Sequence, residues 1–272
     1  MRSFRTDPMK KWRWLSGLCT AVVLCFLILP ILVILPLSFS ASSFLSYPLP
    51  GLSLQWYAEL INNYKWALAL KNSLLIGLAA AAMATVLGIM TAIAVHAIKG
   101  PGKALVFGVF IAPLMTPHII IAVSLFLFYT QLGLTGSFLG IILAHTVLGV
   151  PFVMISALAG LQKFDMTLMR AARSLGGSPW FCYRTVMLPI LRPAIVAGML
   201  FAFITSFDEI VVVLFLAGPE HITLPIRLFE GIRDELTPIV ISAAVIMILI
   251  SVGSMGLVEW LRRRSEVASP QS

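Results

Sequence analysis

The chain has 272 residues, of which 60% are hydrophobic and only 11% are charged. A soluble domain carries about 25% charged residues, so this composition excludes a water-exposed globular protein and indicates a polytopic helical membrane protein. The net charge of +8 does not indicate nucleic-acid binding, because the basic residues lie in short segments between long apolar runs, as membrane topology places them.

Six apolar segments are each long enough to cross a bilayer, which takes about 20 residues. They cover residues 15–39, 67–97, 104–129, 138–160, 193–217 and 237–261. The first is too long for the apolar part of a signal peptide, so we predict an uncleaved span. The expected fold is all-α with six transmembrane helices. It comprises an N-terminal tail (1–14), one transmembrane domain (15–261) and a C-terminal tail (262–272).

Most of the 19 Lys and Arg residues lie on one predicted side of the membrane. They occupy the N-terminal tail, the 99–103 turn, the 161–192 loop and the C-terminal tail. Cytoplasmic loops are enriched in Lys and Arg, so we predict a bacterial inner-membrane protein with both termini in the cytoplasm.

Small residues recur at four-residue spacing in two of the segments. Gly77, Ala81 and Thr85 form one such row, and Gly198, Ala202 and Ser206 form another. Small residues let membrane helices approach closely, so both rows are predicted helix contact faces.

The 161–192 loop is the most informative segment. Its apolar residues recur at three- and four-residue steps, which predicts a helix with one apolar stripe: Leu161, Phe164, Leu168, Ala172 and Leu175. Gly176 and Gly177 are expected to end it, because glycine accepts the left-handed conformation of a C-cap. Ser178 can N-cap a second helix that begins at Pro179 and stops near Pro189. This helix–turn–helix would expose Trp180 and Phe181, and exposed aromatic groups usually mark a docking surface.

The same loop carries a recognisable motif. The permeases of binding-protein-dependent ABC importers have Glu-Ala-Ala, three residues, Gly, nine residues, then Ile-x-Leu-Pro. This chain has Arg170-Ala171-Ala172, then Gly176 followed by Gly177, then Val186, Leu188 and Pro189 at matching spacing. Val186 replaces Ile conservatively, whereas Arg170 reverses the charge of the motif's Glu. The chain therefore resembles type I importer permeases, which implies the MetI-like fold.

That resemblance implies a coupling loop, formed by these motif residues, that sits in a cleft of an ATPase subunit. No G-x-x-x-x-G-K-[ST] phosphate loop occurs in the sequence, so ATP and Mg would be bound by a partner chain and this chain would hold no cofactor. The implied partners are an ABC ATPase homodimer, a second homologous permease forming a heterodimer, and a periplasmic substrate-binding protein, all at the lipid bilayer.

Asp208 and Glu209 lie inside the fifth apolar segment. An acid at the centre of a membrane helix costs about 2.5–3.5 kcal/mol, so such residues usually face water or a partner. One interpretation is a helix break with solvated acids; the other is a lining that attracts cations. Thr205 and Asp208 would share one helix face. Phe207 could hold an ammonium group or gate the path, although an isolated Phe in a span usually only packs.

The run from Ser206 to Ile210, followed by Ala217-Gly218-Pro219-Glu220, is similar to the spermidine/putrescine-type branch of the same permeases. The resemblance implies a small cationic solute such as a polyamine. Other branches move amino acids, other amines, phosphonates or ferric ion, and these solutes stay open.

Two other classes compete with the importer. One is a channel or ion-coupled secondary transporter with Asp208 and Glu209 as its coupling site, and the other is an intramembrane enzyme. An enzyme would need a paired nucleophile and base or a metal cluster, which the sequence does not assemble. His118 and His145 are expected to hydrogen-bond to neighbouring helices rather than bind metal. The motif spacing favours the importer.

Overall fold

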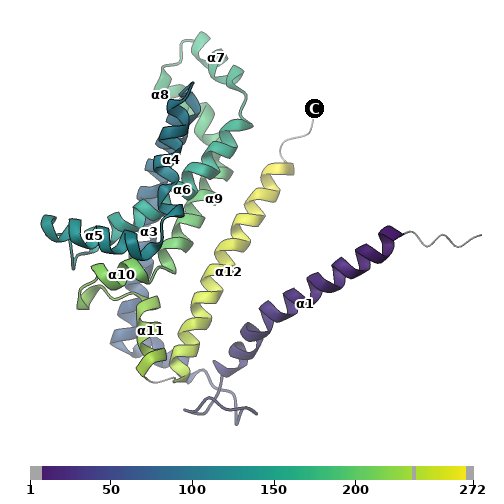
Figure 1. Ribbon diagram of the computed structural model, residues 1–272, viewed down its shortest axis with the longest axis vertical. Helices are drawn as coiled ribbons and strands as arrows, with labels where there is room; N and C mark the ends of the chain where they lie inside the picture. Colours follow the sequence, from purple (N-terminus) through teal and green to yellow (C-terminus); the bar gives the residue numbers. More distant parts are fainter. Residues whose placement is uncertain (1–7, 235–236, 268–272) are drawn as a thin grey trace, which may run out of the picture. The chain divides into compact units, whose positions relative to one another are not determined.

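The computed structural model describes residues 8–234 and 237–267, and the tail residues 1–7 and 268–272, predicted to be cytoplasmic, lie outside the described residues. The regular secondary structure of the described residues is helical, apart from one isolated β-bridge between Ser40 and Leu52 (Figure 1). It divides into two compact units, one formed by residues 1–62 and 231–246 and the other by residues 63–230 and 247–272. The single domain over 15–261 stays a prediction.

The first unit contains α1 (Pro8–Leu37) and α2 (Gln55–Asn62), together with the start of α12 (Pro238–Val267). Side-chain hydrogen bonds connect the segment after α1 to α2 and to α12. The Tyr57 hydroxyl donates to Ser38 Oγ at 2.7 Å, and the Ser242 hydroxyl donates to the Ser38 carbonyl at 3.3 Å. Over the span Trp12–Leu37, α1 has a strongly apolar surface with none of its most hydrophobic window buried, as a lipid-facing helix requires.

The second unit contains the remaining helices. In chain order they are α3 (Tyr64–Ala97), α4 (Gly102–Met115), α5 (His118–Leu132), α6 (Phe138–Gln162), α7 (Met166–Ser174), α8 (Pro179–Cys182), a π-helix (Tyr183–Met187), α9 (Leu188–Phe207), α10 (Val211–Leu216), a 3-10 helix (Pro219–His221), the greater part of α11 (Leu224–Asp234) and the end of α12. Figure 1 shows α3, α6 and α9 running side by side, with α5 crossing their direction.

Small residues allow α3, α6 and α9 to pack closely. A β-carbon added to Gly149 of α6 would lie 3.1 Å from the β-carbons of both Ala84 and Ala202. One added to Gly198 would lie 2.8 Å from the backbone of Val153. The predicted contact face of the fifth segment is therefore found in the structure, where Gly198, Ala202 and Ser206 are all buried.

Two predicted spans are interrupted. The segment 104–129 is not one helix, because α4 ends at Met115, α5 begins at His118, and their axes differ by 102°. Thr116 is extended before Pro117, as proline requires of the residue that precedes it. The segment 193–217 likewise breaks at 208–210, between α9 and α10. The described residues therefore contain five helices that could span a membrane, or six if the bent pair counts as one span.

The prediction that the helix after Ser178 stops near Pro189 is wrong. Residues 179–207 are helical throughout, with a π turn at 183–187 in which the Leu188 N–H donates to the Tyr183 carbonyl. A proline ring clashes with the carbonyl four residues before it in an α-helix, and the wider π turn accommodates Pro189. The loop helix and the fifth span are consequently one helix.

Candidate functional site

The coupling segment, defined as residues 165–189, forms the predicted elbow. Asp165 caps α7, since its Oδ1 accepts the Thr167 N–H at 2.8 Å. Hydrogen bonds from the Thr167 hydroxyl and backbone hold the pKa of Asp165 below its usual value. Ser178 caps α8 by accepting the Phe181 N–H at 3.2 Å, and Pro179 occupies the first helical turn. The sequence predicts the Ser178 cap and the place of Pro179. It does not predict the Asp165 cap, and Leu161 and Leu168 lie on two helices, because α6 ends at Gln162 and α7 begins at Met166.

Two glycines make the turn of the elbow tight. Gly176 has a φ of +85°, a conformation that other residues rarely adopt. A β-carbon on Gly177 would lie 2.8 Å from the Ala172 carbonyl oxygen and 3.0 Å from the Cys182 sulfur. The turn therefore requires Gly176 for its backbone conformation and Gly177 for its close contacts.

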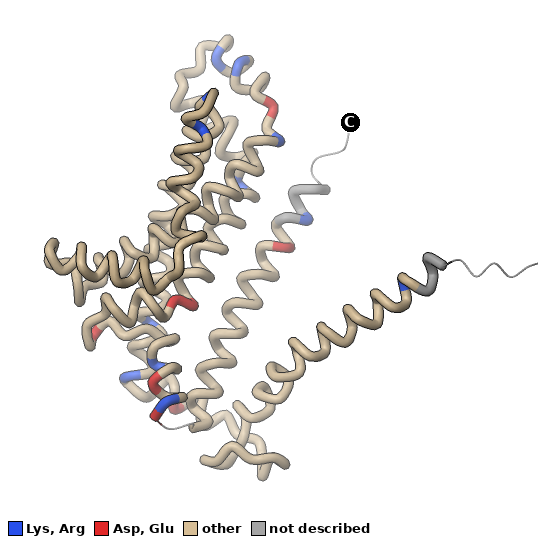
Figure 2. Tube along the Cα trace, in the orientation of Figure 1, with Lys and Arg blue, Asp and Glu red and all other residues tan. Residues whose placement is uncertain are grey.

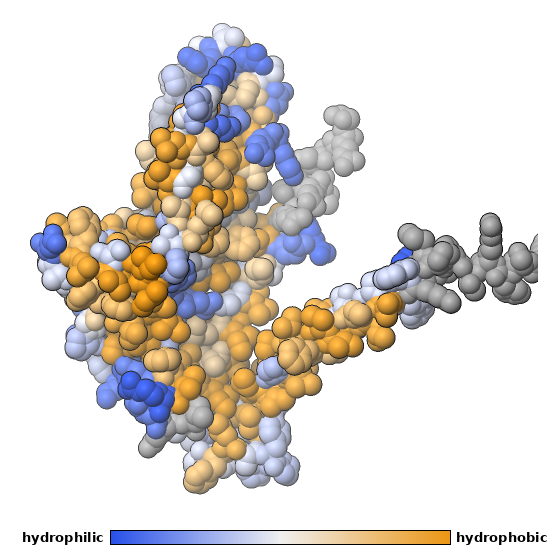
Figure 3. Space-filling view, in the orientation of Figure 1, coloured by the Kyte–Doolittle hydropathy of each residue, from blue (hydrophilic) through white to orange (hydrophobic). Residues whose placement is uncertain are grey.

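The coupling segment buries one side and exposes the other. Met169, Cys182 and Met187 belong to a buried cluster together with residues of α3, α6 and α9. At the tip, Leu175, Trp180 and Phe181 are 89%, 70% and 54% exposed. The buried side attaches the elbow to the ends of the spans, and the tip offers apolar surface to a partner. Figure 2 shows Lys and Arg clustered over α7, and Figure 3 shows hydrophilic residues over the same helix, with hydrophobic ones over α4 and α5.

The motif residues occupy different parts of this elbow. Ala171, Arg170 and Pro189 are exposed, while Ala172, Val186 and Leu188 are partly buried. The Arg170 guanidinium donates to the Thr167 hydroxyl at 3.3 Å. The charge that replaces the motif's Glu therefore lies on the surface of α7.

The four residues that the sequence places in a substrate path lie at the end of α9 and in the break after it, and they differ in exposure. Asp208 is exposed and Thr205 is partly buried. Phe207 is 1% exposed and stacks on Phe203, with ring centroids 5.5 Å apart. Glu209 is 5% exposed. The break thus brings Asp208 to the surface of the chain, whereas Phe207 and Glu209 point into its interior.

Glu209 is held by two elements that the sequence does not connect. Its Oε1 accepts the Val212 N–H of α10 at 2.9 Å, and its Oε2 lies 3.2 Å from Nδ1 of His118, the first residue of α5. The sequence did not predict that His118 contacts Glu209. The only local signal is Pro117, which marks a kink without giving its direction.

His145 hydrogen-bonds to a neighbouring helix, as expected. Its Nδ1 lies 2.6 Å from the Ser206 hydroxyl, which links α6 to α9 inside the packed core. Among the described residues, no group of three or more His, Cys, Asp or Glu could hold a metal ion.

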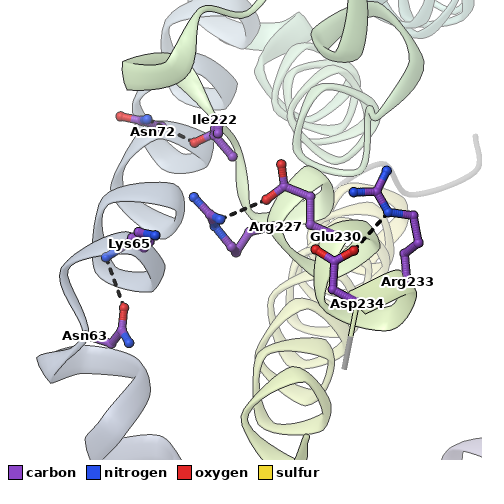
Figure 4. A network of polar contacts seen from close by, with 8 residues as sticks. All are labelled: Asn63, Lys65, Asn72, Ile222, Arg227, Glu230, Arg233 and Asp234. Atoms are coloured by element: carbon purple, nitrogen blue, oxygen red, sulfur yellow. Dashed lines mark hydrogen bonds and ion pairs between the residues drawn. The ribbon is translucent and has the colours of Figure 1, made fainter. Parts of the chain in front are cut away.

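The loop between α10 and α11 is fastened to α3. The Asn72 amide donates to the carbonyls of Glu220 and Ile222, each at 3.0 Å, and Figure 4 shows the contact with Ile222. The Leu224 N–H donates to Ser73 Oγ at 2.8 Å. These bonds fix the chain that follows the break, at the end of the unit opposite the coupling segment (Figure 1).

Comparisons with known proteins agree with this geometry. Residues 84–267 match the family described as "Binding-protein-dependent transport system inner membrane component". The chain is 34% identical over 245 residues to the spermidine/putrescine transport system permease protein PotC of Haemophilus influenzae, covering 90% of this chain and 95% of that one. It is 32% identical over 249 residues to the putrescine transport system permease protein PotI of Escherichia coli, covering 89% and 88%.

Solved structures share the fold at low sequence identity. A chain of a bacterial ABC transporter that imports alginate superimposes with a TM-score of 0.76 at 15% identity, covering 95% of this chain and 99% of that one. A chain of the methionine ABC transporter MetNI superimposes with a TM-score of 0.55 at 16% identity, covering 77% and 99%.

The match to the family extends from α3 through the coupling segment to α12. A subunit of this kind is not itself an enzyme, because ATP is bound by the partner ATPase. The chain belongs to the binding-protein-dependent transport system inner membrane components, the multi-pass permease subunits of ABC importers.

Proposed function

We propose that this chain is one half of the membrane pathway of a polyamine importer, taking up spermidine, putrescine or a cation of that class. The observation that carries the proposal is the exposed Asp208 at the break of α9, in a chain 34% identical to a spermidine/putrescine permease over nearly its whole length. A polyamine carries ammonium groups along a methylene chain, and a carboxylate at the end of an apolar membrane helix attracts such a group.

The coupling segment is proposed to dock in a cleft of an ABC ATPase dimer. Its exposed Trp180 and Phe181 offer apolar contact surface, and the elbow is rigid because both of its helices are capped. Since α8 runs without a stop into α9, a displacement of the docked elbow would move the helix that ends beside Asp208. A periplasmic binding protein delivers the solute, and a second, homologous permease completes the pathway.

The orientation follows from charge. Basic residues gather in the coupling segment and in the tails, so these regions face the cytoplasm. Asp208 is about 20 residues or ~30 Å further along the helix from Pro189, which places it toward the periplasmic side where an imported solute enters.

The test is uptake of labelled spermidine and putrescine by the reconstituted complex of this chain with its ATPase, partner permease and binding protein. We expect ATP-dependent uptake that excess polyamine abolishes and that an excess of a neutral amino acid or a phosphonate leaves intact. Uptake of neither polyamine would refute the assignment of the solute.

Asp208→Asn tests the path itself. Removing the charge that attracts an ammonium group should raise the KM for polyamine about ten-fold, which corresponds to a lost charge-assisted hydrogen bond. Assembly should be unchanged. Glu220→Gln is the matched control, because it removes one negative charge from an exposed residue whose carbonyl, rather than its side chain, contacts Asn72. A wild-type KM in Asp208→Asn would remove Asp208 from the path.

A further inference from the structure

Two interrupted helices approach each other at a polar contact between His118 and Glu209. The first interruption lies at residues 116–117, where α4 and α5 differ in direction by 102°, and the second lies at 208–210, between α9 and α10. His118 begins α5 and Glu209 lies in the second interruption. Their side chains approach to 3.2 Å between Nδ1 and Oε2. An interrupted helix leaves backbone groups unpaired, so such breaks need side-chain partners to hold them in a membrane protein.

Glu209 has both oxygens engaged by its own chain. Oε1 receives the Val212 N–H at the start of α10, and Oε2 faces His118. The Glu209 side chain is 4% exposed. A carboxylate that is buried, with one oxygen accepting a backbone N–H and the other facing an imidazole nitrogen, is poorly placed to receive an ammonium group from the pathway. Its neighbour Asp208 is exposed, so the two adjacent acids have different roles.

The His118 contact lies where three elements join. Beyond it, α5 and α10 share a buried apolar cluster that includes Ala122, Tyr129, Val212 and Leu216. Before it, α9 runs back to the coupling segment. The imidazole is 46% exposed, so it reaches a buried carboxylate from a position open to the surroundings of the chain.

We infer that His118 is a positioning residue for transport: by holding Glu209 inside the chain, it fixes the break after α9 with Asp208 as the carboxylate presented to the cation. This inference rests on the proposed function, because it assigns Asp208 to the path. The same arrangement also restricts how the cation is recognised. The break presents one carboxylate instead of two, so it engages one ammonium group of a polyamine, and the other ammonium groups bind elsewhere in the assembled pathway.

The geometry allows an atom-specific test. The amide nitrogen of Asn lies at the same distance along the side chain as Nδ1 of His, whereas that of Gln reaches one atom further and resembles Nε2. In the reconstituted complex, His118→Ala should raise the KM for spermidine about ten-fold, as expected when a buried carboxylate loses the polar partner that faces one of its oxygens. His118→Asn should restore most of the affinity, and His118→Gln should not. If His118→Ala does not assemble, the comparison of Asn with Gln carries the test.

A double variant separates positioning from a general structural role. If His118 acts through Asp208, the variant Asp208→Asn with His118→Ala should have the KM of Asp208→Asn alone, since the two residues lie in one interaction chain. Additive effects, an unaffected His118→Ala, or equal loss in His118→Asn and His118→Ala would overturn the inference while leaving the proposed path intact. A wild-type KM in Asp208→Asn is the separate sign that the path itself is wrong.

Discussion

Replacing Gly176 should uncouple ATP hydrolysis from transport. Its φ of +85° lies in the left-handed region, where an L-residue with a β-carbon costs about 1–2 kcal/mol. No atom lies within 4 Å of the position that an added β-carbon would take, so the effect comes from the backbone conformation and not from a clash. A cost of this size reduces the population of the correct elbow about 5- to 30-fold. Gly176→Val should reduce the population of the correct elbow most strongly, because a β-branched residue tolerates positive φ least.

The assay is the amount of solute moved per ATP hydrolysed in proteoliposomes. Gly176→Val should lower this ratio while ATP hydrolysis by the partner continues. Gly176→Asn is the matched control, since Asn adopts the left-handed conformation more readily than other residues with a β-carbon. A wild-type ratio in Gly176→Val, or an equal loss in Gly176→Asn, would refute the reasoning from φ.

Three further predictions concern the tip, the core and the first cap. Trp180→Ala should reduce the ATPase recovered with the permease without changing permease unfolding, because Trp180 is 70% exposed; undiminished recovery would contradict docking there. Gly149→Leu should destabilise the permease by about 1–3 kcal/mol in thermal unfolding, since its β-carbon would lie 3.1 Å from two alanines, whereas Gly108→Leu, with nothing within 4 Å, should not. The pKa of Asp165 is lowered by its Thr167 hydrogen bonds, so its capping is complete above its unfolded-state pKa of about 3.9 and is lost as the pH falls through the lower folded value. The protection of the Thr167 amide against exchange, measured relative to its intrinsic rate, should therefore fall only at acidic pH, and Asp165→Asn should remove that pH dependence.

The elbow could be predicted from sequence because its signals are local. Gly176, Ser178 and Pro179 each act through their own backbone or through a hydrogen bond three residues away. The error at Pro189 arose from the same local reasoning, because proline usually ends a helix, whereas here a π turn retains the helix through it.

The site around the break could be predicted only in part. Two adjacent acids in an apolar segment signal function, and the alternative of a helix break at Asp208 is what the structure contains. The partner of Glu209 lies 91 positions earlier in the chain, as His118. Their contact depends on the 102° bend between α4 and α5, after which α5 packs against α10. Hydrophobic periodicity does not determine the angle between two helices. The sequence therefore could not predict that Glu209 is buried while Asp208 is exposed.

The central claim is that this permease moves its solute only when a separate ATPase drives the coupling segment. The most direct measurement is spermidine accumulation in liposomes containing this chain with its partner permease and binding protein, with the ATPase and ATP either supplied or left out. We predict accumulation against a gradient only when both are present. Accumulation without the ATPase, driven by a proton or sodium gradient, would contradict the account and identify a secondary transporter instead.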